Sequence, residues 1–119
     1  ELRVVTPRGS SKAGRIWVGA YPALSETEPN NNTGQPQKLE KLPVVISGQI
    51  NGGEDVDVFT FRAEAGQTLV FDLVSQQMAS ALDGFLTLTD ARNKVLTSAQ
   101  EGFDRDPRIV RTFKAAGTY

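Results

Sequence analysis

Two stretches in the middle of the chain alternate between apolar and polar side chains. Residues 56–63 place Phe59 and Phe61 on one face of an extended chain, and residues 67–75 repeat the pattern. Successive side chains of a strand point to opposite faces, so a period of two predicts strands with one buried face. The turn residues at 64–66 predict that these two strands form a hairpin with aligned apolar faces.

Similar signals recur along the chain and predict an all-β protein. No window of a dozen residues carries an uninterrupted helical period, and only residues 76–82 suit a short helical turn. We expect eight strands, at residues 2–5, 15–18, 43–50, 56–63, 67–75, 85–90, 94–98 and 108–114. Short strands separated by turns rich in Gly, Asn and Pro predict an antiparallel β-sandwich of jelly-roll type.

Composition divides the chain into three parts. Residues 1–22 are expected to form an N-terminal strand pair, which either closes a preceding β domain or extends this one. Residues 23–42 are rich in Pro, Asn, Thr, Glu and Gln, and they are expected to form an acidic arm and linker. Residues 43–119 are expected to form the sandwich itself.

The chain contains no histidine and no cysteine. It therefore lacks the commonest general base near neutral pH and the usual partner of a serine or cysteine nucleophile. Thiolate and imidazole ligands for transition metals are excluded as well. These absences disfavour a hydrolase subdomain, and we expect a non-catalytic protein.

The net charge of −1 is unevenly distributed. Residues 1–20 carry Arg3, Arg8, Lys12 and Arg15 against Glu1, which gives +3 and leaves −4 for the rest of the chain. A mildly acidic body has no clustered basic face, so nucleic acid is not an expected partner. No apolar run approaches the length of a bilayer span, so membrane insertion is not expected either. The opening residues lack a signal-peptide core, and we interpret the chain as a fragment whose targeting signals lie elsewhere.

Oxygen-bearing side chains are densest in two segments. Glu26 and Glu28 alternate with Thr27 in an extended stretch, and Asp55 and Asp57 share one side of a strand entrance. Calcium binds about six to eight oxygens from carboxylates, amides and main-chain carbonyls. If the arm folds against that strand, the four carboxylates converge and repel one another unless a cation lies among them. The alternative is a solvated acidic linker beside an acidic turn, and the spacing leaves both interpretations open.

These two acidic segments belong to a series of motifs along the chain. The motifs are Glu26-Thr27-Glu28-Pro29-Asn30-Asn31, Gly48-Gln49-Ile50, Asp55-Val56-Asp57-Val58-Phe59-Thr60-Phe61, Ala65-Gly66-Gln67-Thr68-Leu69, Ser80-Ala81-Leu82-Asp83, Asp106-Pro107 and Gly117-Thr118-Tyr119. In this order and spacing, residues 24–119 resemble the bacterial pre-peptidase C-terminal domain family. Members of that family are jelly-roll-like β-sandwiches attached to secreted peptidases and other exported proteins.

The resemblance implies a metal site. In the related collagen-binding domains of clostridial collagenases, calcium clamps an N-terminal acidic arm to the sandwich. Carried over to this chain, the ligands are Glu26, Glu28 and Asn30 from the arm, with Asp55 and Asp57 from the strand entrance. Calcium is thus the expected cofactor.

The resemblance also implies a setting for the domain. We expect an accessory domain of a bacterial multidomain protein that is secreted, periplasmic or on the cell surface. Its partners would be neighbouring domains of the same polypeptide, and its work would be domain orientation, stability or extracellular targeting. The alternative is an adhesive module that binds an extracellular polymer, such as a collagen-like protein or a polysaccharide. The family continues into a further strand after the Gly-Thr-Tyr motif, so the sandwich is expected to lack its last strand here.

Overall fold

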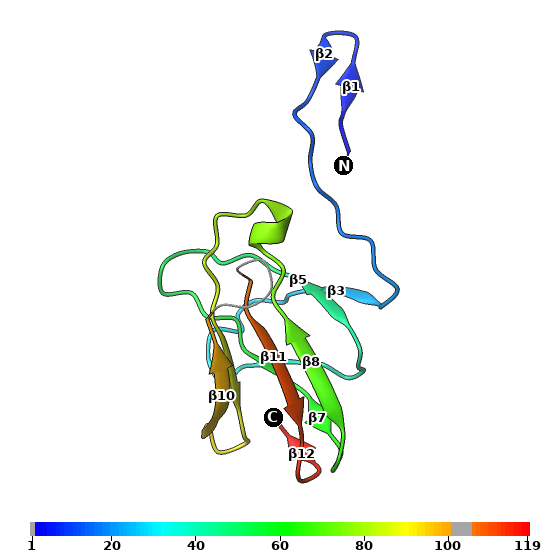
Figure 1. The fold of residues 1–119 in the computed structure, drawn as a ribbon. Helices are drawn as coiled ribbons and strands as arrows, with labels where there is room; N and C mark the ends of the chain where they lie inside the picture. Colours follow the sequence, from blue (N-terminus) through cyan, green and yellow to red (C-terminus); the bar gives the residue numbers. More distant parts are fainter. Residues whose placement is uncertain (1, 101–105) are drawn as a thin grey trace.

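The structure, a computed structural model, describes residues 2–100 and 106–119, and β-strands dominate it (Figure 1). The strands are β1 (Val5–Thr6), β2 (Gly9–Ser10), β3 (Ala23–Ser25), β4 (Gln37–Lys38), β5 (Val45–Ser47), β6 (Phe59–Thr60), β7 (Arg62–Ala63), β8 (Thr68–Asp72), β9 (Leu86–Thr89), β10 (Val95–Ala99), β11 (Arg108–Thr112) and β12 (Gly117–Thr118). One 3-10 turn, η1 (Gln76–Met78), lies in the segment predicted to turn helically. The described ranges contain no helix that is long and apolar enough to cross a membrane. The all-β prediction is confirmed.

Short ladders connect these strands. The antiparallel pairs are β1–β2, β7–β12, β8–β11 and β9–β10, and the parallel pairs are β3–β5 and β4–β6. Both parallel pairs join the segment 23–42 to the body of the sandwich. The polar composition of this segment indicated a linker, but main-chain hydrogen bonding does not require apolar side chains. The segment therefore lies along the sandwich as two additional edge strands.

Strands β7 and β8 do not form the predicted hairpin. β8 pairs with β11 along its whole length, whereas β7 pairs with β12. Phe61 and Phe71 instead meet between the two ladders, with ring centroids 5.3 Å apart. The hairpin prediction is wrong because the two apolar faces pack against each other rather than lying side by side in one sheet.

The core lies between these ladders. Its buried apolar side chains are Phe61, Ala63, Leu88, Ile109 and Phe113. Phe113 is 1% exposed, and its ring lies 4.4 Å from that of Tyr119 and 6.0 Å from that of Phe61. The phenylalanine face predicted for residues 56–63 therefore meets the core.

The C-terminal strand β12 was not predicted, because two residues are too short for a periodic signal. The pairing of β12 with β7 continues through Tyr119, whose main chain exchanges two hydrogen bonds with that of Phe61, each 3.0 Å long. This part of the edge of β7 is therefore paired.

The N-terminal strand pair forms at a different place from the predicted one. The turn Pro7-Arg8 joins β1 to β2, and residues 15–18 form no strand. Gly9 has a φ of 134°, which favours glycine and lets the chain reverse early. The hairpin projects from the sandwich in Figure 1. After the hairpin in the chain, Arg15 Nη1 donates a hydrogen bond to the carbonyl oxygen of Gln77 in η1 at 2.5 Å.

Candidate metal centre

Hydrogen bonds hold the acidic arm against the sandwich. The Glu26 N–H donates to the Ser47 carbonyl oxygen at 2.9 Å, which continues the pairing of β3 with β5. In β4, the side chain of Gln37 accepts from the Thr27 N–H at 2.8 Å and donates to the Ser25 carbonyl oxygen at 3.1 Å. The start of the arm therefore has a fixed path along the edge of the sandwich.

The far end of the arm reaches the strand that carries the second acidic pair. The Asn30 carbonyl oxygen accepts from the Val58 N–H at 2.9 Å, although the two residues are distant in sequence. The Asn30 N–H in turn donates to Glu28 Oε2 at 3.0 Å. Asparagine is usually exposed, but Asn30 is fully buried here. The arm thus brings its carboxylates and one buried amide to the entrance of β6.

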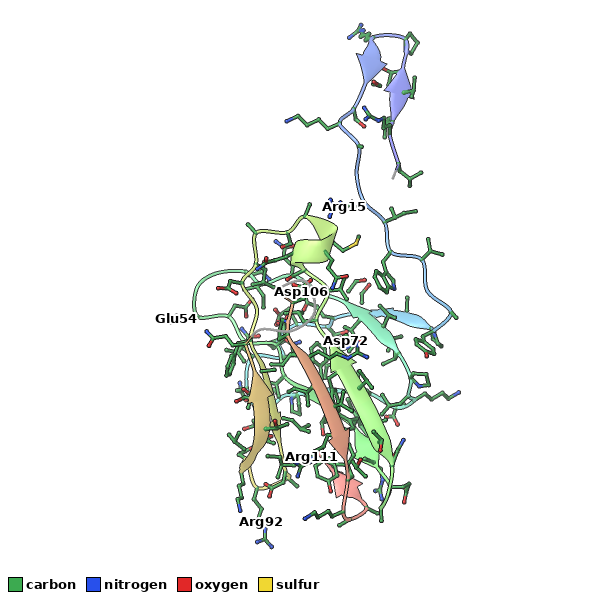
Figure 2. All side chains as sticks on the ribbon, in the orientation of Figure 1. Arg15, Glu54, Asp72, Arg92, Asp106 and Arg111 are labelled. Carbon is green, nitrogen blue, oxygen red and sulfur yellow. The ribbon has the colours of Figure 1, made fainter. Side chains whose placement is uncertain are left out.

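Three carboxylates meet at this entrance. The Asn51 N–H donates to Asp55 Oδ2 at 2.5 Å, which ties this carboxylate to the preceding loop. Glu28, Asp55 and Asp57 each offer a carboxylate oxygen, and the three oxygens lie within 4.8 Å of one another. Glu54, the remaining acid of the loop, is exposed and lies at its outer edge in Figure 2.

Glu26 lies beside this cluster. Its Oε1 accepts from the Gln49 N–H at 2.6 Å, and its Oε2 is buried. Burial is the largest cause that raises the pKa of Asp57 from 3.8 to about 6, followed by the negative charge and the closeness of the Glu26 carboxylate. Asp55 and Glu28 raise the pKa of Asp57 further. All four predicted carboxylates therefore belong to one electrostatic cluster.

The cluster is also where buried polar atoms lack partners. Within residues 2–100 and 106–119, the buried side-chain atoms without a hydrogen-bond partner are Glu26 Oε2, Asn30 Oδ1, Asn30 Nδ2, Asp55 Oδ1, Asp57 Oδ1 and Arg111 Nε. All but the last belong to four of the five predicted ligands, Glu26, Asn30, Asp55 and Asp57. An unsatisfied buried oxygen costs about 1 to 3 kcal/mol, so such atoms call for a partner such as water or an ion.

This donor set suits a hard divalent cation. Carboxylate and amide oxygens are the ligands that calcium prefers, and nothing in the set attracts a soft metal. Glu26, Glu28, Asp55 and Asp57 would supply the negative charge, and Asn30 would supply a neutral amide oxygen. A cation there would neutralise the charge repulsion that, after burial, helps to raise the pKa of Asp57.

Comparisons with family models, with curated proteins and with solved structures found no match for this chain.

Sequence reasoning missed the residues that support the cluster. Gln37 was part of a segment assigned by composition alone, yet its side chain bridges two points of the arm. Gly48 lies directly under the Glu26 carboxylate. Gly48 stands in one of the motifs that carry the family resemblance, but no local pattern gives either residue its role, because both roles depend on segments that meet only in the folded chain.

A second buried acid, Asp106, fixes the turn η1. Its carboxylate accepts from the N–H groups of Ser75, Gln76 and Gln77 at 3.0 to 3.1 Å and from the Ser75 hydroxyl at 2.5 Å. Figure 2 labels Asp106 beside this turn. Burial by itself raises the pKa of Asp106, but these hydrogen bonds outweigh it and lower the pKa from 3.8 to about 2. Asp106 therefore has a structural role. It stabilises the turn whose Gln77 carbonyl oxygen accepts the hydrogen bond from Arg15.

The substitution Asp106→Asn is expected to lower the free energy of unfolding at neutral pH by about 2 kcal/mol, because one pKa unit corresponds to about 1.4 kcal/mol. The folded-state pKa lies below the ordinary value, so ionised Asp106 stabilises the fold above pH 3.8, and this contribution is lost as the pH falls through about 2. Urea unfolding of both proteins should show the difference shrinking to about half near pH 3. A difference that stayed constant down to that pH would contradict the assignment.

Proposed function

We propose that this chain is a non-catalytic accessory domain of a secreted bacterial multidomain protein, in which calcium locks the acidic arm onto the β-sandwich. One observation carries the proposal. Carboxylate oxygens of Glu28, Asp55 and Asp57, which come from two distant segments, lie within 4.8 Å of one another, and Glu26 raises the pKa of Asp57 beside them. Glu26, Asn30, Asp55 and Asp57 each hold a buried oxygen without a partner. The resemblance of the same motifs to the pre-peptidase C-terminal domain family supports the same function.

The mechanism is a change in how firmly the arm is attached. Without a cation, the carboxylates at the junction repel one another and favour detachment of the arm. A bound calcium ion would convert this repulsion into attraction on both sides of the junction. Residues 1–22 precede the arm, so a locked arm would fix the direction in which the chain enters the sandwich. Domain orientation and stability are therefore the work we assign to the domain.

The exposure of the site favours a location where calcium is abundant. Glu28 is exposed, and Asp55 and Asp57 are only partly buried. We assign this partly exposed site to the class of extracellular modules, which bind calcium at about 0.1 to 1 mM. A secreted, periplasmic or cell-surface location fits such an affinity.

Isothermal titration of the chelator-treated protein with calcium chloride tests the proposal directly. We expect one calcium ion per chain and a loss of binding of at least about tenfold in Asp57→Asn, because a charged ligand is removed. The control is Asp83→Asn, which neutralises an exposed aspartate outside the cluster and should bind as the parent does. Absence of heat from the parent protein at millimolar calcium, with no binding by equilibrium dialysis, would overturn the calcium proposal.

A further inference from the structure

The carboxylate of Glu26 occupies the space that a side chain at position 48 would need. A Cβ placed on Gly48 would overlap Glu26 Oε2, and it would lie 2.9 Å from Cδ and 3.4 Å from Oε1 of the same side chain. Contacts of this kind force one of the two groups to move. Glu26 is the group that can move, since it is a flexible side chain.

The backbone at Gly48 does not explain why glycine stands there. Gly9, Gly52 and Gly66 have positive φ angles, which side chains rarely adopt, whereas Gly48 does not. Alanine would therefore fit the main chain at position 48. The observed obstacle to a side chain there is the Glu26 carboxylate.

Glu26 is held in this place by a specific contact. Its Oε1 accepts from the N–H of Gln49, the residue after Gly48, at 2.6 Å, while Oε2 is buried without a partner. A methyl group at position 48 would displace the carboxylate and is expected to break this hydrogen bond. The substitution would therefore change the position of one ligand and leave the core unchanged.

We propose that Gly48 is a positioning residue for the cation site: its missing side chain leaves the space in which the Glu26 carboxylate is seated. The inference rests on the proposed calcium function and adds a residue that would not itself coordinate the cation. Residues that orient metal ligands typically change metal affinity by about 10- to 100-fold when they are altered.

The chain offers a matched control at Gly53. A Cβ added to Gly53 meets no atom within 4 Å, and its φ is not positive. Gly53 also belongs to the loop that leads to Asp55, so Gly53→Ala stiffens the same region without touching Glu26. Any general effect of replacing glycine near the site should appear in both variants.

The test combines calcium affinity with a readout that needs no calcium. Gly48→Ala is expected to weaken calcium binding at least about tenfold, and Gly53→Ala to leave it unchanged. In a Glu26→Ala background, Gly48→Ala should cause no further loss, because the residue that it displaces is already absent. In chelator, the Gln49 amide proton should have a downfield shift that is lost in Gly48→Ala and Glu26→Ala but kept in Gly53→Ala.

The outcomes separate this inference from the calcium proposal. If the parent protein binds no calcium, the proposed function fails. The Gln49 amide shift still tests whether the Glu26 carboxylate occupies the space beside Gly48. If Gly48→Ala binds calcium as tightly as the parent, or keeps the Gln49 shift, the positioning role is overturned. If Gly48→Ala does not fold, Glu26→Asp provides a second test, because the shorter side chain moves the carboxylate away from the space beside Gly48. Parent-like calcium affinity in Glu26→Asp would equally overturn the role.

Discussion

Calcium at about 100 times its dissociation constant is expected to raise the melting temperature of the chain by about 10 °C, and excess chelator should reverse the rise. Binding at this level stabilises the folded state by about 2.7 kcal/mol, and each kcal/mol shifts the melting temperature of a domain of this size by about 4 °C. Thermal unfolding followed by circular dichroism measures the shift. Equal shifts with magnesium would contradict a site suited to calcium.

The substitution Asp57→Asn is the control for this experiment. The folded-state pKa of Asp57, about 6, exceeds the ordinary 3.8, so its ionisation opposes folding and stability is lost as the pH rises from 3.8 through 6. In chelator at neutral pH, the uncharged variant is therefore expected to melt above the parent protein. With calcium present the order should reverse. A variant that keeps the parent's calcium response would remove Asp57 from the site.

The substitution Phe113→Ala is expected to lower the free energy of unfolding by about 4 kcal/mol. Phe113 is the most deeply buried of the large apolar side chains, and its ring contacts Tyr119 and Phe61. Removing it leaves a cavity between the ladders that the short surrounding strands cannot close. Urea unfolding in chelator measures the loss without any contribution from calcium.

Val110 provides the matched comparison for Phe113. It lies in β11, three residues earlier, and its side chain is 60% exposed on the outer face. Val110→Ala is therefore expected to change the free energy of unfolding by no more than about 0.5 kcal/mol. Similar losses in both variants would show that the core does not lie where the structure places it.

Together, the two predictions separate the stability of the sandwich from the stability of the arm. Phe113 belongs to the core between the ladders, whereas Asp57 belongs to the junction between arm and body. Changes at sites that share no partners usually add. The calcium response of Phe113→Ala should accordingly equal that of the parent, measured where the variant is still folded.

Much of the architecture was predictable from local pattern. Period-two alternation identified the strand regions around β6 to β8, and it placed Phe61 correctly in the core. The predicted ligands could be named for a similar reason: carboxylates two residues apart in an extended chain face one way. The folded structure brings Glu28, Asp55 and Asp57 together and places Glu26 beside Asp57, and the binding of calcium stays a prediction.

The choice of strand partners was decided only by the tertiary structure. The hairpin predicted between β7 and β8 does not form, and the supposed linker supplies β3 and β4. Side-chain periodicity reports which face of a strand is buried, but it does not report which main chain lies beside that strand. The ladders depend on N–H and carbonyl groups that every residue carries.

The same reason explains the supporting residues. Gly48 matters because Glu26 lies over it, and Asp106 matters because three N–H groups of another segment point at it. The sequence by itself determined the alternation that makes strands and the acids available to bind a cation. Only the tertiary structure decided which strands pair, which glycine gives a carboxylate room and which acid holds a turn, because these roles exist only between segments that meet on folding.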